Sequence, residues 1–154
     1  MPETLQLLVF TIDAQRYALH VSAVERAIRM VEITPLPKSP GIVSGVVNFH
    51  GAVVPVLNIR SRFGLPEREP ELGDQLLIAR TSRRMVALVV DSVHDVVTLP
   101  SGELVEPEAI LPQLEHLEGV ARLDDGMVFI QDLDAFLSLE EEQTLAAAIE
   151  EECS

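Results

Sequence analysis

The stretch 45–64 constrains the fold more than any other part of the sequence, and it reads GVVNFHGAVVPVLNIRSRFG. Two β-branched runs, Val46–Phe49 and Ala52–Leu57, flank the pair His50-Gly51. A glycine in this position takes a positive φ at no steric cost, as the second residue of a tight hairpin turn does. The stretch therefore predicts a β-hairpin, and it presents no group that reacts with a substrate.

The second run of this hairpin is followed by a change of pattern. Pro55 has no backbone N–H to donate, so we expect its strand to lie at an edge or to carry a bulge at that point. Ile59 and Phe63 are four residues apart, and Gly64 follows them. This spacing predicts one helical turn with a glycine cap.

Short runs separated by turn residues recur along the whole chain, as expected for antiparallel strands. The predicted strands are Leu7–Ile12, Arg16–Val21, Gln75–Thr81, Met85–Asp91, Val93–Leu99, Val120–Leu123 and Met127–Gln131. A doubly wound parallel sheet would need helices of about ten or more residues between its strands, and the sequence has no such segments there. A mostly β, barrel-like architecture follows.

Two segments carry the signature of a helix start, a serine followed by a glutamate three residues later. Ser22 and Glu25 open the first, and Val24, Ala27, Ile28 and Val31 follow at helical spacing, which predicts a short early helix. Ser138 and Glu141 open the second, which predicts a C-terminal helix that buries Leu145, Ala148 and Ile149.

The charge of the chain is unevenly distributed. Residues 1–101 hold ten acidic and ten basic side chains, whereas residues 102–154 hold fifteen acidic side chains and only Arg122, which accounts for the net charge of −14. This half repels a polyanion or an anionic membrane, and the chain lacks a basic, aromatic-rich patch. We therefore expect neither nucleic-acid binding nor direct membrane insertion.

Residues that could carry catalysis are not arranged for it. The four histidines, His20, His50, His94 and His116, do not pair with each other or with Cys153 at a metal-ligand spacing. Asp91, His94 and Asp95 are close in sequence, but a strand would point His94 to the opposite face. The sequence therefore predicts no catalytic residue, no metal, no cofactor and no enzyme. Its single cysteine and the lack of a signal peptide favour a cytoplasmic protein.

The chain resembles the CheW family of chemotaxis coupling proteins in the order and spacing of its motifs over nearly all of residues 7–137. The motifs are Leu7-Leu8-Val9-Phe10, Tyr17-Ala18-Leu19, Val24-Glu25-Arg26, Ile33-Thr34-Pro35-Leu36-Pro37, Gly45-Val46-Val47-Asn48, Gly51, Val54-Pro55-Val56-Leu57-Asn58-Ile59-Arg60, Phe63-Gly64, Val86–Val93 and Gly119–Leu123. The resemblance implies two packed five-stranded SH3-like β-barrel subdomains over residues 5–139, followed by an acidic C-terminal helix and tail over 140–154.

The resemblance also implies a function. Family members are non-catalytic adaptors that couple the cytoplasmic tips of chemoreceptors to the regulatory domain of a CheA-type histidine kinase. By this analogy the receptor tip docks in a groove between the barrels, at Asn48, His50, Gly51 and Asn58. The kinase contacts an apolar patch around Val24, Ala27 and Ile28.

Two positions depart from the family pattern. The turn normally reads Asn-x-Arg-Gly, and this chain has His50 in the third place; Asn58 stands where the family has an aspartate. These departures bear on which receptor and kinase the protein serves. A paralogue in a chemosensory pathway with an output other than motility, and a β-barrel sensor for a small ligand, are the alternative functions.

Overall fold

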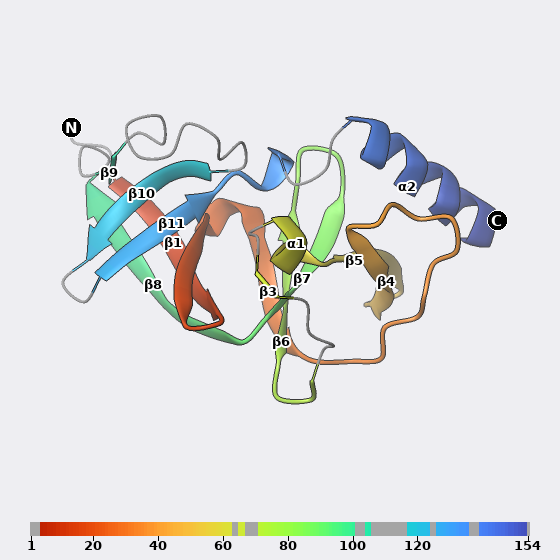
Figure 1. The fold of residues 1–154 in the computed structure, drawn as a ribbon, viewed down its shortest axis with the longest axis horizontal. Coiled ribbons are helices and arrows are strands. Elements are labelled where there is room, and N and C mark those ends of the chain that lie inside the picture. The colour runs from red at the N-terminus through yellow and green to blue at the C-terminus, as the bar shows by residue number, and fades with distance from the viewer. Residues whose placement is uncertain are drawn as a thin grey trace.

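Two β-sheets lie side by side along the long axis of the computed structural model, and a helix lies beside the second sheet at the C-terminal end (Figure 1). The structure describes residues 4–62, 65–66, 71–100, 104–105, 117–123, 126–135 and 139–153. The predicted mostly β class, with two packed β-subdomains and a C-terminal helix, is confirmed.

The first sheet has the strand order β8-β1-β2-β11-β10-β9. Its strands are β1 (Thr4–Ile12), β2 (Gln15–His20), β8 (Ser92–Pro100), β9 (Leu104–Val105), β10 (Leu117–Leu123) and β11 (Gly126–Gln131). All of its pairs are antiparallel except β11 with β2. The two-residue strand β9 adds a sixth strand at its edge by pairing with β10.

The second sheet has the strand order β3-β6-β7-β5-β4. Its strands are β3 (Val24–Arg29), β4 (Val43–Phe49), β5 (Ala52–Leu57), β6 (Gln75–Arg80) and β7 (Met85–Val90). The helices are α1 (Ile59–Arg62), which follows β5, and α2 (Leu139–Cys153). The predicted turn of helix at Ile59 is confirmed, whereas Phe63 and Gly64 lie outside the described residues.

Pro55 does not place β5 at the edge of the second sheet, because β5 lies between β7 and β4. The sheet accommodates the missing N–H in another way. β5 pairs with β7 only from Val56 onward. The pairing of these two strands therefore does not require the backbone N–H that Pro55 lacks. The bulge in this hairpin is in β4, between Val43 and Gly45.

The early helix predicted from Ser22 is wrong. A three-residue 3₁₀ helix, Val21–Ala23, comes first, and residues 24–29 then form strand β3. β3 pairs with β6 from Val24 to Arg29, so the pairing of the second sheet overrides the local capping pattern. A bulge between Val24 and Arg26 interrupts the two-residue alternation of a regular strand, so the apolar residues of this segment do not show the pattern expected of one.

The described residues form three hydrophobic clusters, one of which joins the two sheets. The largest, the junction core, takes residues from both sheets and from α2, including Phe10, Leu57, Leu88 and Leu145. Each sheet has a further cluster on its other face, called here the first-sheet core and the second-sheet core. The inner strands are buried on both faces, which is why their sequences are nearly continuous hydrophobic runs.

One glycine is required by a close backbone approach. A Cβ atom at Gly45 would collide with the carbonyl oxygen of Thr34, and would lie 2.8 Å from Cγ2 of Ile33. Thr34 approaches because its backbone exchanges two hydrogen bonds with Val46, at 2.9 and 2.8 Å. These bonds hold the segment after β3 against β4.

Candidate partner-binding surfaces

The turn between β4 and β5 presents three of the predicted receptor-binding residues together. His50 and Gly51 both have positive φ, 51° and 84°, as the two central residues of a type I′ turn require. The backbone N–H of Gly51 donates to Oδ1 of Asn48 at 2.9 Å. Asn48, His50 and Gly51 are exposed, so the turn is an ordered surface feature.

The side chain of His50 rests against its neighbour at the tip of this turn. The rings of Phe49 and His50 have centroids 4.3 Å apart and meet edge to face at 65°. Phe49 is half-buried and packs against the second-sheet core, so it supports the exposed imidazole from below. The tip therefore offers a partner an aromatic ring with two nitrogen atoms.

Asn58 does not join this group. It follows the last residue of β5, and the six residues of that strand place it roughly 20 Å from the turn. Its backbone N–H donates to the carbonyl oxygen of Ile42 at 2.6 Å, at the start of α1. The structure thus separates the four predicted receptor-binding residues into a turn set and a single residue at the far end of the hairpin.

The predicted kinase-binding residues lie on β3, an edge strand of the second sheet. The bulge after Val24 sends its side chain to the junction core, while Ile28 packs against the second-sheet core. Both side chains are half-buried, and Ala27 is exposed. The three residues therefore do not form one apolar patch, and of the three only Ala27 is exposed.

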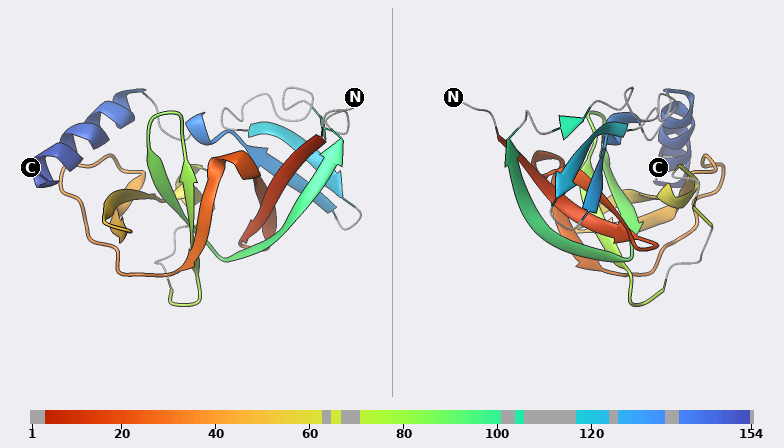
Figure 2. Two further views of the ribbon diagram at one scale, coloured as in Figure 1. Left: turned by 180° about the vertical axis from the view of Figure 1, so that it is seen from behind. Right: turned by 60° about the vertical axis from the view of Figure 1, so that its left-hand side comes forward.

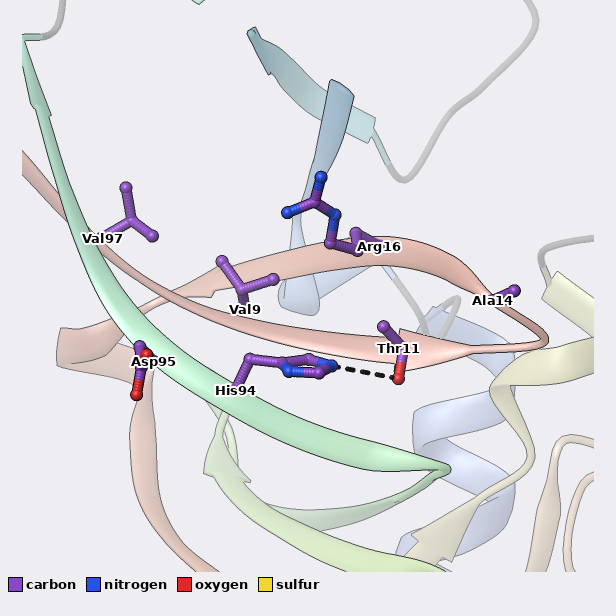
Figure 3. A pocket seen from close by; sticks show the side chains of 7 residues that line it. All are labelled: Val9, Thr11, Ala14, Arg16, His94, Asp95 and Val97. Atoms are coloured by element: carbon purple, nitrogen blue, oxygen red, sulfur yellow. Dashed lines mark hydrogen bonds between the residues drawn. The ribbon is translucent and has the colours of Figure 1, made fainter. Parts of the chain in front are cut away.

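Among the described residues, two hollows are lined by none of the predicted receptor-binding or kinase-binding residues. The larger, about 500 Å³, opens against β1, β2 and β8, with Val9 and Val97 among the residues that line it (Figure 3). On its wall Nε2 of His94 lies 3.4 Å from Oγ1 of Thr11, as the dashed line in Figure 3 marks, and 3.2 Å from Oγ of Ser92. Each oxygen already has the other as a partner, at 2.6 Å.

The smaller hollow, about 220 Å³, lies where the two sheets meet. Leu19 and His20 reach it from β2, Arg80 reaches it from β6, and Asp132 and Asp134 reach it from the segment after β11. We call it the junction hollow. It is the hollow that corresponds to a groove between the two subdomains, and none of the predicted receptor-binding residues lines it.

A buried arginine joins the two sheets. Arg60 of α1 is only 6% exposed, and its Nη1 donates to Oδ2 of Asp13 at 2.8 Å. Its Nη2 donates to Oδ1 of Asp91 at 3.1 Å. We call these three residues the Arg60 clasp. Asp13 belongs to the β1–β2 turn of the first sheet, whereas Arg60 follows β5 of the second.

The clasp also affects the neighbouring tyrosine. Burial raises the pKa of the Tyr17 phenol, the charge of Asp13 raises it further, and the charge of Arg60 acts in the opposite direction. Tyr17 stacks on Phe10, with ring centroids 5.9 Å apart, and belongs to the junction core. The neutral phenol is thus the form that the fold favours.

Over the part of the chain that the structure describes, no three His, Cys, Asp or Glu side chains come together as a metal site. Asp91, one of the three residues considered for a metal from the sequence, is instead an ion-pair partner of Arg60. Within the same residues, no helix has both the length and the apolar character needed to cross a membrane.

The family model of the CheW-like domain matches residues 6–141. The chain therefore belongs to the CheW-like domain family. It is 28% identical over 140 residues to chemotaxis protein CheW of Rhizobium meliloti (strain 1021), covering 90% of each chain. It is 29% identical over 136 residues to the probable chemotaxis protein CheW of Rhizobium etli, covering 86% of this chain and 87% of that one.

A solved structure of the CheW family shares the fold. The scaffolding protein TtCheW from Thermoanaerobacter tengcongensis superposes with a TM-score of 0.81 at 26% identity, and the match covers 92% of this chain and 96% of that one. Both subdomains and their connection therefore fall within the likeness.

Sequence reasoning found the exposed turn of this CheW-like domain but missed the clasp and the junction hollow. Arg60 was visible in the family motif, yet its partners lie 47 and 31 positions away in the chain. The junction hollow draws on β2, β6 and the segment after β11, so only the assembled fold reveals it.

Proposed function

We propose that this protein is a chemotaxis adaptor, which couples the cytoplasmic tips of chemoreceptors to a CheA-type histidine kinase. The match of the CheW-like family over residues 6–141 carries this proposal. The curated relatives and the scaffolding protein TtCheW support it, because the chain covers most of their length as well as its own.

The adaptor acts in the cytoplasm and without catalysis. Its candidate binding surfaces are an exposed, hydrogen-bonded turn at Asn48–Gly51 and a sheet edge at β3. Exposed turns and sheet edges are features that bind other proteins. We assign coupling to residues 5–139, and we treat 140–154 as an acidic C-terminal helix that supports that domain.

The receptor contacts the turn through Asn48, His50 and Gly51, and the kinase contacts the β3 edge at Ala27. His50 is the residue that tunes receptor affinity. Arginine in this place offers a permanent charge and a planar fork of five N–H donors, whereas the imidazole offers two ring nitrogens. Val24, Ile28 and Asn58 then support these faces from within the fold.

Complex formation tests the proposal. Purified protein, a receptor cytoplasmic fragment and a CheA-type kinase should elute together in size-exclusion chromatography, and each pair should bind in calorimetry. We expect His50→Arg to change receptor affinity by about tenfold, roughly 1.4 kcal/mol, without changing kinase affinity. A wild-type protein that binds neither partner contradicts the adaptor function.

The β3 edge has its own matched pair of variants. Ala27→Glu adds a charge at an exposed site, so it should weaken kinase binding while the melting temperature stays within a few degrees. Ile28→Glu places the charge against the second-sheet core, so it should lower the melting temperature. Unchanged kinase binding by folded Ala27→Glu would remove β3 from the kinase face.

A further inference from the structure

We infer that Arg60 is a positioning residue: its clasp with Asp13 and Asp91 sets the angle between the two sheets, and with it the width of the junction hollow and the position of the receptor-contacting turn at Asn48–Gly51 relative to the first sheet. This inference rests on the proposed function. Its geometric half, the fixed angle between the sheets, stands on contacts alone and can be tested separately.

The Arg60 clasp holds one of the two connections by which the chain crosses between the two sheets, the other being the 3₁₀ helix Val21–Ala23 between β2 and β3. β7 of the second sheet ends at Val90 and β8 of the first sheet begins at Ser92, so Asp91 alone connects them. A connection this short is where a hinge between two packed bodies would bend, because a few dihedral angles there change their relative orientation. Arg60 holds the side chain of that residue at 3.1 Å.

The crossover residue is also tied to the first sheet. The backbone N–H of Asp91 donates to the carbonyl oxygen of Thr11 at 2.9 Å. Its Oδ2 accepts a hydrogen bond from the backbone N–H of Asp13 at 2.8 Å, so its two carboxylate oxygens bond Asp13 and Arg60 separately. Asp13 itself has φ of 51°, a conformation that is costly for a residue other than glycine and that the clasp helps to hold.

The planar guanidinium group fixes the directions of the hydrogen bonds in the Arg60 clasp. Its two terminal nitrogens lie in one plane and bond two different carboxylates, while Nη1 also donates to the carbonyl oxygen of Pro66 at 3.2 Å. The Arg60 side chain is 7% exposed, whereas Asp13 and Asp91 are 37% and 33% exposed. A lysine carries the same charge but not the planar fork, so it cannot hold both carboxylates in this geometry.

The junction hollow is the part of the molecule that the angle between the sheets would change. Leu19 and His20 line it from the first sheet, and Arg80 lines it from the second. A rotation of one sheet against the other moves these walls apart or together. A protein whose sheets sample many angles therefore spends less time in the arrangement that a docking partner fits, which weakens the apparent affinity.

The distance between the sheets can be measured directly. Spin labels at Thr98 on β8 and Val53 on β5, both exposed, report it by pulsed electron paramagnetic resonance in a full-length Cys153→Ser background. Arg60→Lys should broaden or shift the distance distribution. It should also weaken receptor-fragment binding by about tenfold. Asp91→Asn tests the same contact from a partly exposed partner if Arg60→Lys does not fold.

Arg84 supplies the matched control. Its Nε donates to Oε1 of Glu142 on α2 at 2.5 Å, so it is also a shielded arginine in an ion pair, but it does not bridge the two sheets. Arg84→Lys should lower stability and leave the distance distribution as in the wild type. Folded Arg60→Lys or Asp91→Asn with the wild-type distribution overturns the inference. A wild type that never binds the receptor fragment overturns the proposed function instead, and the distance measurement still decides the clasp.

Discussion

Oδ1 of Asn48 accepts a hydrogen bond from the backbone N–H of Gly51 at 2.9 Å, across a turn in which the intervening His50 has a positive φ. The side chain of Asn48 thus stabilises a backbone conformation that costs His50 energy, since only glycine and a few short polar residues adopt it readily. The stability of the turn and the orientation of the His50 ring are therefore linked.

Removal of this hydrogen bond should loosen the turn. We expect Asn48→Ala to lower the free energy of unfolding by about 1 kcal/mol, the usual net value of one hydrogen bond, as measured by urea denaturation. Asn48→Asp keeps an oxygen acceptor in place and should lose less. Equal losses in the two variants would show that the hydrogen bond contributes nothing.

A side chain at Gly45 should be far more damaging than one at Gly41. Gly45→Ala puts a Cβ into the backbone of Thr34, so we expect a loss of about 3 kcal/mol in the free energy of unfolding. A Cβ at Gly41 meets nothing within 4 Å, and Gly41→Ala should change stability by less than about 0.5 kcal/mol. Similar melting temperatures for the two variants would contradict the close approach of Thr34 to β4.

Glu142 should be the acidic residue of α2 on which the stability of the fold most depends. It is 7% exposed and pairs with Arg84, and α2 also buries Leu145 in the junction core. Glu142→Ala leaves a shielded guanidinium without its carboxylate, at a cost of about 3 kcal/mol in unfolding free energy. Glu150 is exposed, and Glu150→Ala should stay within about 0.5 kcal/mol.

Stability should fall at high pH through Tyr17. Its pKa is raised above the ordinary value of 10.0, so the folded state holds the proton more tightly than the unfolded state. The resulting stabilisation is complete below about pH 10 and is lost as the pH rises through the folded-state pKa. Tyr17→Phe should flatten the decline in urea midpoint between pH 9 and pH 11.

Tyr17 is the only tyrosine in a chain without tryptophan, so the ultraviolet absorbance of its phenolate gives its titration in the folded protein directly. The midpoint should lie above that of the urea-unfolded chain. Coincident midpoints would show that burial among Phe10 and Phe129 does not disfavour the phenolate.

Most of the strands were predictable because their own side chains specify them. The run 52–57 is apolar and rich in β-branched residues, and the turn before it contains Gly51, which adopts the positive φ that the turn requires. The segment 24–29 was not predictable in this way, since Ser22 and Glu25 mimic a helix start while the bulge after Val24 shifts the apolar spacing. Pairing with β6 decided the outcome, and β6 lies far along the chain.

The residues of the candidate site also differ in whether their contacts are local in the sequence or come from distant strands. Asn48, His50 and Gly51 lie within four positions of the sequence, and Asn48 and Gly51 share a hydrogen bond, so the sequence could show the three as one feature. The Arg60 clasp and the junction hollow join residues from distant strands. The family resemblance grouped Asn58 with the turn residues, although it follows the far end of β5. Interactions between residues close in the sequence can be predicted from the sequence, whereas contacts between distant elements cannot.

The order of the strands has a consequence for synthesis of the protein. The second sheet is built from one continuous segment, β3 to β7, whereas the first sheet takes β1 and β2 from one end of the chain and β8 to β11 from the other (Figure 2). On a ribosome, which releases the N-terminal part first, the β1–β2 hairpin emerges early and must wait for its partners. Residues 24–90 can complete their own pairing in the meantime. The sheet that begins the sequence is therefore the one that finishes folding last.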